Sequence, residues 1–96
     1  MDENIIDLVK KHKDKMESVF KYISIVKDDE FSTKILHIAK DYYNDSLYFM
    51  DKQDYIRAFE ALIISWSFIN AGILNGSFKS LFTWVRNVFM LTKSNN

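Results

Sequence analysis

Apolar residues recur at three- and four-residue steps along most of this chain, which is the pattern of helices that each bury one face. The longest such stretch runs from Ile35 to Gly76 and is interrupted by the polar tetrapeptide 51–54. We expect a helix–turn–helix hairpin here, with arms over residues 31–52 and 55–75. Asp54 has the side chain of an N-cap for the second arm.

The first arm of this hairpin carries two apolar stripes about 100° apart on a helix. The first stripe contains Ile35, Ile38, Ala39, Tyr42, Ser46 and Phe49, and the second contains Leu36, Tyr43, Leu47 and Met50. Roughly half of the helix surface is therefore apolar, more than a single neighbour can cover. We expect this arm to be the middle helix of a bundle.

A third helix is predicted before the hairpin, over residues 4–26. Its apolar positions follow a heptad seam, which is typical of packing in a left-handed bundle: Ile5, Val9, His12, Met16, Val19, Ile23 and Val26. The charged stretch 27–30 follows as a turn, in which Asp28 or Asp29 can cap the next helix.

The second arm of the hairpin is apolar around most of its circumference. Ala58, Ser65 and Gly72 recur every seven residues, and their small side chains allow a neighbouring helix to approach closely. The outward side carries a set of apolar residues that needs another covering surface, namely Ile64, Phe68 and Ala71.

A fourth, amphipathic helix is predicted over residues 77–92, after a C-cap at Gly76. Trp84 and Leu91 belong to its wide apolar face and would extend the interaction patch of Ile64, Phe68 and Ala71. Lys79, Arg86 and Lys93 form a basic stripe on the opposite side. The predicted fold is all-α, an up-and-down three-helix bundle with an additional C-terminal helix, in one domain over residues 1–96.

Composition supports one folded domain and offers little catalytic chemistry. Of the 96 residues, 48% are hydrophobic and 27% charged, and there is neither proline nor cysteine. These values indicate a globule without disulfides, and with no apolar run of membrane-spanning length we expect a cytoplasmic protein. The net charge of zero argues against a general nucleic-acid binder. All thirteen acids nevertheless lie at or before Glu60, and the last 36 residues carry three bases and no acid.

Three segments of the hairpin resemble a known family. They are IAKDYYNDS at residues 38–46, DYIRAF at residues 54–59 and NAG at residues 70–72. The chain resembles the small archaeal proteins of the domain of unknown function 357 family, with the pattern A-x-x-Y-Y-x-D-A-x-x-F, then G-D-Y-x-x-A-L, then W-x-D-A-G. The resemblance implies a three-helix up-and-down bundle in an archaeal, cytoplasmic setting and implies no activity.

Three positions depart from that family pattern. Gln53 stands where the family has glycine. If the turn needs a left-handed backbone at this position, glutamine in place of glycine costs about 1 kcal/mol of stability. Phe68 replaces a tryptophan, and Asn70 replaces an aspartate, so any chemistry that this aspartate performs in relatives is lost here. The tetratricopeptide-like pattern of Asp54, Tyr55 and Ala58 has no second copy at the period that a repeat array requires.

Three groups of polar or aromatic residues are candidates for chemistry, and each also has a structural interpretation. His37, Asp41 and Asp45 form a ladder at four-residue spacing that could contribute metal ligands but is also typical of a solvated face. His12 lies in the predicted seam, where a hydrogen-bonded core histidine is expected rather than a ligand. Four tyrosines cluster at the hairpin and suit either base stacking or packing, namely Tyr42, Tyr43, Tyr48 and Tyr55. We predict no catalytic site, no metal site and no cofactor.

Two interpretations of function follow. The first is a protein–protein interaction module that binds itself as a homodimer, or another protein, through the patch of Ile64, Phe68, Ala71, Trp84 and Leu91. The alternative is a nucleic-acid-binding accessory protein that uses the basic stripe of Lys79, Arg86 and Lys93. An enzyme built on the His37 ladder is a third and weaker hypothesis.

Overall fold

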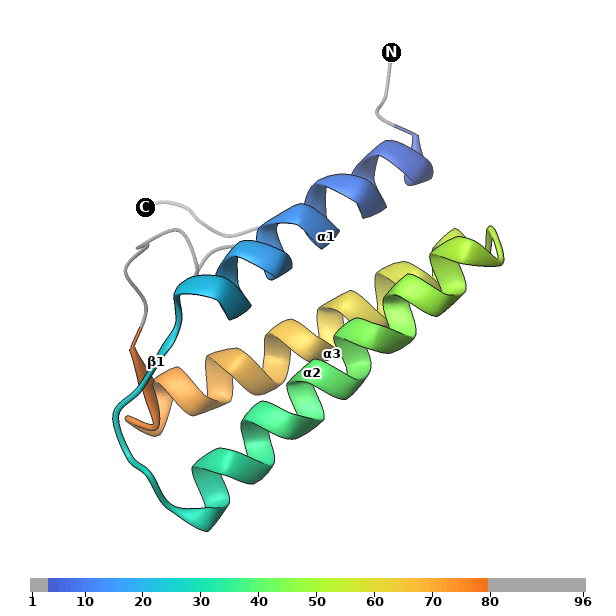
Figure 1. Ribbon diagram of the computed structural model, residues 1–96. Coiled ribbons are helices and arrows are strands. Elements are labelled where there is room, and N and C mark those ends of the chain that lie inside the picture. Colours follow the sequence, from blue (N-terminus) through green and yellow to red (C-terminus); the bar gives the residue numbers. More distant parts are fainter. Residues whose placement is uncertain (1–3, 80–96) are drawn as a thin grey trace.

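Over residues 4–79 the protein is all-α, with three helices and one very short strand pair (Figure 1). The computed structural model describes residues 4–79. In chain order the elements are α1 (Ile5–Tyr22), β1 (Ser24–Ile25), α2 (Glu30–Asp51), α3 (Tyr55–Leu74) and β2 (Phe78–Lys79). The bounds of α2 and α3 differ from the predicted arms by no more than one residue at each end.

The α2–α3 hairpin is fixed by local signals at its turn and by small side chains along its interface. Asp54 caps α3 by accepting a hydrogen bond from the backbone N–H of Arg57 at 3.2 Å, as predicted. Gln53 has a positive φ of 60°, the left-handed conformation that the family resemblance implies at this position. Farther along, the Ser65 hydroxyl donates to the Ala39 carbonyl at 2.6 Å, so the two backbones lie close together.

The α3 helix, not α2, is the central helix of the fold. The α2–α3 interface is the largest, α1 packs mainly on α3, and α1 touches α2 much less. The prediction that the first arm is the middle helix is therefore wrong. Two apolar stripes on one helix do not specify which neighbours cover them. The buried core draws on all three helices and on β2: Val9, Met16, Val19, Ile35, Ala39, Ala58, Leu62, Trp66, Ile69 and Phe78.

The first helix ends earlier than predicted. α1 stops at Tyr22, because Ile23 is extended with ψ 142° and Ser24–Ile25 pair antiparallel with Phe78–Lys79. The Ser77 carbonyl also accepts from the backbone N–H of Val26 at 2.7 Å. The β-branched residues of this segment favour extended backbone, and the pairing with a segment over 50 residues away provides it. Val26 is 60% exposed and does not extend the seam.

The predicted fourth helix does not begin at Ser77. The chain reverses at Gly76, whose φ is 81°, and Phe78–Lys79 then form β2. Phe78 is buried against Gly72, where any side chain would overlap its ring. The remainder of the predicted helix, residues 80–92, lies outside the described residues.

Hydrogen bonds between polar groups hold this end of the hairpin together. The Ser32 hydroxyl donates to Ser77 Oγ at 2.7 Å, and the Asn75 side-chain amide donates to the same oxygen at 2.9 Å. Lys27 reaches across to donate to the Asn75 backbone carbonyl at 2.8 Å. The first turn of α2, the end of α3 and the segment after α1 are thereby tied together.

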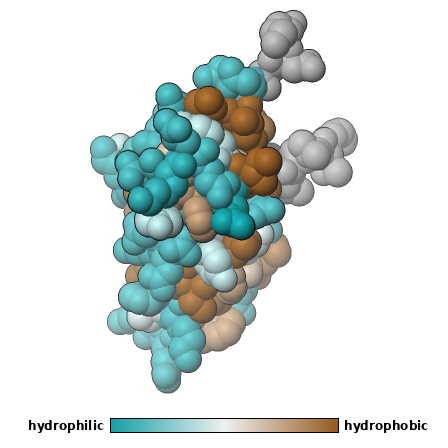
Figure 2. Space-filling model, turned by 90° about the vertical axis from the view of Figure 1, so that its right-hand side faces the viewer, coloured by the Kyte–Doolittle hydropathy of each residue, from teal (hydrophilic) through white to brown (hydrophobic). Residues whose placement is uncertain are grey.

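Apolar side chains also remain exposed on this small fold. The end of the molecule that carries the α2–α3 turn is largely hydrophilic, with hydrophobic side chains gathered along one side (Figure 2). Among the described helices, α3 is long and apolar enough to cross a membrane by length and composition, and 39% of that stretch is buried inside the fold. A core helix has the same composition, and α3 fills that role here.

Candidate functional site

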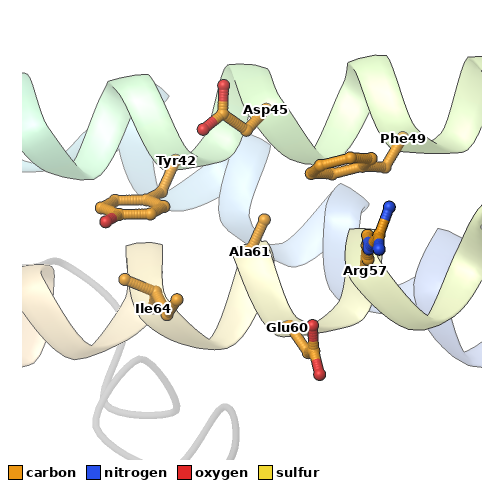
Figure 3. Close-up of a pocket in the computed structure, with 7 residues that line it drawn as sticks. All are labelled: Tyr42, Asp45, Phe49, Arg57, Glu60, Ala61 and Ile64. Carbon is orange, nitrogen blue, oxygen red and sulfur yellow. The ribbon is translucent and has the colours of Figure 1, made fainter.

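A cavity of about 170 Å³ lies between α2 and α3 (Figure 3). From α2 come the rings of Tyr42 and Phe49, which point toward α3. From α3 come Ala61 at the floor and Ile64 at one side. Charged residues complete the lining, namely Asp45, Arg57 and Glu60.

Helical periodicity explains why these side chains share one side of the hairpin. Phe49 follows Tyr42 by seven residues on α2, and Ile64 follows Arg57 by seven residues on α3. The residues next to them point elsewhere: Tyr43 packs edge-on against Phe20 of α1, with ring centroids 5.5 Å apart. The cavity therefore opens on the side of the hairpin that α1 leaves uncovered.

An aromatic stack continues the cavity along the hairpin. The rings of Tyr42 and Phe68 are almost parallel, with an interplanar angle of 9° and centroids 6.2 Å apart. We call the cavity residues together with Phe68 the α2–α3 groove. Phe68 and Tyr42 are only half-buried and Ile64 is 37% exposed, so this apolar surface is incompletely covered by residues 4–79.

The charged side chains of the groove differ in whether they have an ion-pair partner among the described residues. Arg57 Nη1 lies 3.4 Å from Asp54 Oδ2, so this guanidinium has a carboxylate partner within its own helix turn. Asp45 and Glu60 form no ion pair or hydrogen bond in the described part of the chain. Their carboxylates lie at the outer edges of the groove, one on each helix (Figure 3). The groove thus offers an apolar floor between two acidic edges.

The structure brings together part of the predicted interaction patch. Ile64 and Phe68 both lie in the groove, and Ala71 is exposed one turn farther along α3. Trp84 and Leu91 lie outside the described residues. So do Arg86 and Lys93 of the basic stripe, while Lys79 is exposed on β2.

The other candidate residues do not form a common site. Tyr42 lines the groove, Tyr43 faces α1, and Tyr48 is 59% exposed, so these tyrosines offer no shared stacking platform. His12 is half-buried and packs against Phe59, with ring centroids 5.6 Å apart. Arg57 and Glu60 were not among the predicted site residues, and Asp45 was predicted only as a member of the His37 ladder.

The His37 ladder is a surface feature. His37 Nε2 lies 3.8 Å from Asp41 Oδ2, and both side chains are mostly exposed. Asp45, the third member, belongs to the edge of the groove instead. Across residues 4–79 there is no group of three or more histidine, aspartate or glutamate side chains that could hold a metal ion.

A second depression, of about 250 Å³, lies between α1 and α2 and is lined by Glu17, Phe20, Lys40, Tyr43 and Asn44. Burial, and secondarily the charge of Glu17, raises the pKa of Tyr43. A neutral phenol at ordinary pH has no activated partner here, so this depression carries no evident chemistry.

Comparison with known proteins gives a family and a fold. A family model described as "Protein of unknown function (DUF357)" matches residues 6–78. The chain is also similar to a crystal structure of protein AF1782 from Archaeoglobus fulgidus, to which the same family is assigned. The TM-score is 0.64 at 26% sequence identity, over 79% of this chain and 92% of that chain. No curated protein matches the chain.

Proposed function

The chain belongs to the DUF357 family of proteins of unknown function, and from that premise we propose that it is a non-catalytic protein–protein interaction module. Its α2–α3 groove receives an amphipathic helix, supplied by a second copy of the chain or by another protein. A helix laid in a groove between two helices is a common mode of recognition. The observation that carries this proposal is the half-exposed aromatic stack of Tyr42 and Phe68 beside the cavity.

The chemistry of the groove favours binding over catalysis. A pocket for reaction needs convergent polar groups with perturbed acidity, and the groove has an apolar floor with its carboxylates at the outer edges. The aromatic rings and Arg57 are residue types that concentrate binding energy at interfaces. The acidic edges favour a partner helix with cationic residues beside its apolar stripe.

The proposal is tested by placing a charge in the groove. Ile64→Glu adds a carboxylate to the apolar lining of the groove but leaves the buried core untouched, so the fold should survive while binding is lost. Ser67→Glu is the matched control, because Ser67 is exposed on α3 outside the groove. Light scattering over a range of concentrations measures self-association, and co-purification from cell extract compares bound partners.

The expected result is that Ile64→Glu loses the dimer or the co-purifying partner, whereas wild type and Ser67→Glu retain it. Thermal unfolding by circular dichroism confirms that all three proteins are folded. A monomeric wild type whose bound partners are unchanged in Ile64→Glu contradicts the proposal.

A further inference from the structure

We propose that the free edge of β1 is a second interaction surface, at which β1 pairs antiparallel with β1 of a second copy of this chain. The two-residue strands of the two copies then form one four-stranded sheet around a two-fold axis, with the two β1 strands in the middle and a β2 strand on each side. This surface lies at the end of the fold opposite the α2–α3 turn (Figure 1) and shares no residue with the α2–α3 groove.

The hydrogen bonds of β1 leave one of its edges without a partner strand among residues 4–79. Along an antiparallel pair, residues alternate between bonding to the partner strand and facing away from it. The Val26 N–H donates to the Ser77 carbonyl at 2.7 Å. Ser24 and Val26 therefore face β2, whereas the N–H and C=O of Ile25 point away from it. Both residues of β1 are exposed, so another strand can reach this edge.

This edge is complementary to itself. A second copy related by a two-fold axis at Ile25 presents the same N–H and C=O in the opposite direction, so the two Ile25 residues exchange both hydrogen bonds. Residues 23–26 have the sequence Ile-Ser-Ile-Val, which is uncharged and mostly β-branched and so favours extended backbone and strand pairing. Charges and proline are the common means of protecting an edge strand from such pairing, and neither occurs in this segment.

Exposed apolar side chains gather at the same end of the fold. The end of α1, the start of α2 and the end of α3 all reach the end that carries β1 (Figure 1). Together with β1 and its neighbour they contribute five exposed large side chains, namely Tyr22, Ile25, Val26, Phe31 and Leu74. Apolar surface gathered in this way indicates contact with another molecule. It also supplies area that a two-residue strand alone cannot bury.

The charges that flank the segment favour the antiparallel arrangement. Lys21 lies four residues before Ile25 and Asp28 lies three residues after it, and both charged residues are exposed. Antiparallel pairing centred on Ile25 brings the Lys21 end of one copy next to the Asp28 end of the other, so unlike charges meet at both ends of the new strand pair. Parallel pairing would instead place like charges together.

A single cysteine at the two-fold axis tests this geometry, because the chain contains no cysteine of its own. Residues that exchange both hydrogen bonds in an antiparallel pair have Cα atoms about 5.5 Å apart, within the range of a disulfide. Ile25→Cys in the full chain should therefore form a covalent dimer under mild oxidation. Ile56→Cys is the control, because Ile56 is 67% exposed at the start of α3, near the opposite end. We expect Ile25→Cys to link about tenfold faster on non-reducing gels.

A second measurement removes the backbone donor without adding a thiol. Ile25→Pro deletes the N–H that points away from β2, and the two-fold symmetry deletes it from both copies at once. In sedimentation equilibrium this variant should dimerise about tenfold more weakly than wild type. Ile56→Lys, which also removes an exposed isoleucine, should dimerise like wild type. Circular dichroism verifies that each variant is folded.

The flanking charges give a third readout of the same contact. Lys21→Glu should weaken the dimer by repulsion from Asp28 of the other copy. Adding Asp28→Lys to that variant should restore dimerisation, because unlike charges again meet at both ends. Absence of this rescue would overturn the antiparallel register centred on Ile25.

Equal linking rates for the two cysteine variants would overturn the inference, and so would a wild-type chain that stays monomeric at the highest concentrations measured. A dimer that survives Ile25→Pro but dissociates in Ile64→Glu would also overturn it, since that result identifies the α2–α3 groove as the contact between copies. A dimer that survives Ile64→Glu but not Ile25→Pro supports it. Failure at β1 leaves the interaction module to be judged by partner binding in Ile64→Glu, because the two surfaces share no residue.

Discussion

Gln53 shows how a single residue can store strain in an otherwise regular hairpin. Its φ of 60° lies in the region that glycine adopts without steric cost, and the family pattern has glycine there. We predict that Gln53→Gly raises the free energy of unfolding by about 0.5–1 kcal/mol, measured by urea denaturation. Lys52→Gly is the control, because Lys52 has a φ of −86° and gains nothing from glycine. Equal stabilisation by both variants would contradict this explanation.

Asp29 contributes to stability in a pH-dependent way. Its side chain accepts a hydrogen bond from the backbone N–H of Ser32 at 2.8 Å as the N-cap of α2. Hydrogen bonding to Ser32, through its side chain and its backbone, lowers the pKa of Asp29 in the folded state. A lowered pKa means that the stabilisation is complete above the unfolded-state pKa, near 4, and disappears as the pH falls through the folded-state value.

Asp29→Ala should therefore lower the melting temperature by a few degrees at pH 7, and the difference from wild type should narrow below about pH 4. Asp28→Ala provides the matched control, since Asp28 is an exposed neighbour that does not cap the helix. Calorimetry at several pH values measures the melting temperatures of both variants and of wild type. A difference that persists unchanged in acid would show that the carboxylate charge is not the cause.

At the scale of elements, the pairing of β1 with β2 depends on the absence of a side chain at Gly72. A methyl group there overlaps the ring of Phe78, which is 3% exposed and tied to its strand, so it cannot swing away. We predict that Gly72→Ala lowers the free energy of unfolding by about 2 kcal/mol, as overpacking does. Combining it with Phe78→Leu should cost less than the sum of the two single changes. Ala71→Ser is the control, because Ala71 is an exposed neighbour, and it should change the free energy of unfolding little.

Element boundaries could be predicted from the sequence wherever the signal is local. Asp29, Asp54 and Gly76 mark helix ends through their own side chains or backbone, so α2 and α3 were located within a residue. The end of α1 and the strand at residues 78–79 were not predictable in this way, because each depends on pairing with a segment more than 50 residues distant. Local helical periodicity continues through both segments and is overridden by that contact.

The candidate site was predictable in its apolar part only. Ile64 and Phe68 stood out because an outward apolar residue on a helix needs a cover. Glu60 did not, and Asp45 was noticed only as part of the His37 ladder, because a charged residue at the edge of a groove has the same sequence pattern as one on any solvated helix face. Only the distance between α2 and α3 makes them two edges of one surface.

For the whole molecule, the unequal interfaces imply unequal stability. α3 buries seven residues against its neighbours, whereas α1 buries three, namely Val9, Met16 and Val19. The α2–α3 interface is also larger than the interfaces of α1 with α2 and α3 combined, so less contact holds α1 to the fold than joins α2 to α3. Its connection to the hairpin also runs through a two-residue strand pair.

We therefore predict that α1 opens while the α2–α3 hairpin stays folded. In native-state hydrogen exchange, amides of α1 should exchange with a lower opening free energy than amides of α3. The opening free energy of the α2 amides should be close to that of the α3 amides. Met16→Ala should lower protection throughout α1 and leave the α2–α3 interface nearly unchanged at low denaturant. Ala58→Gly, at the α2–α3 interface, should instead lower protection in both α2 and α3. If all three helices exchange with one common free energy, the fold opens as a single unit and this prediction is contradicted.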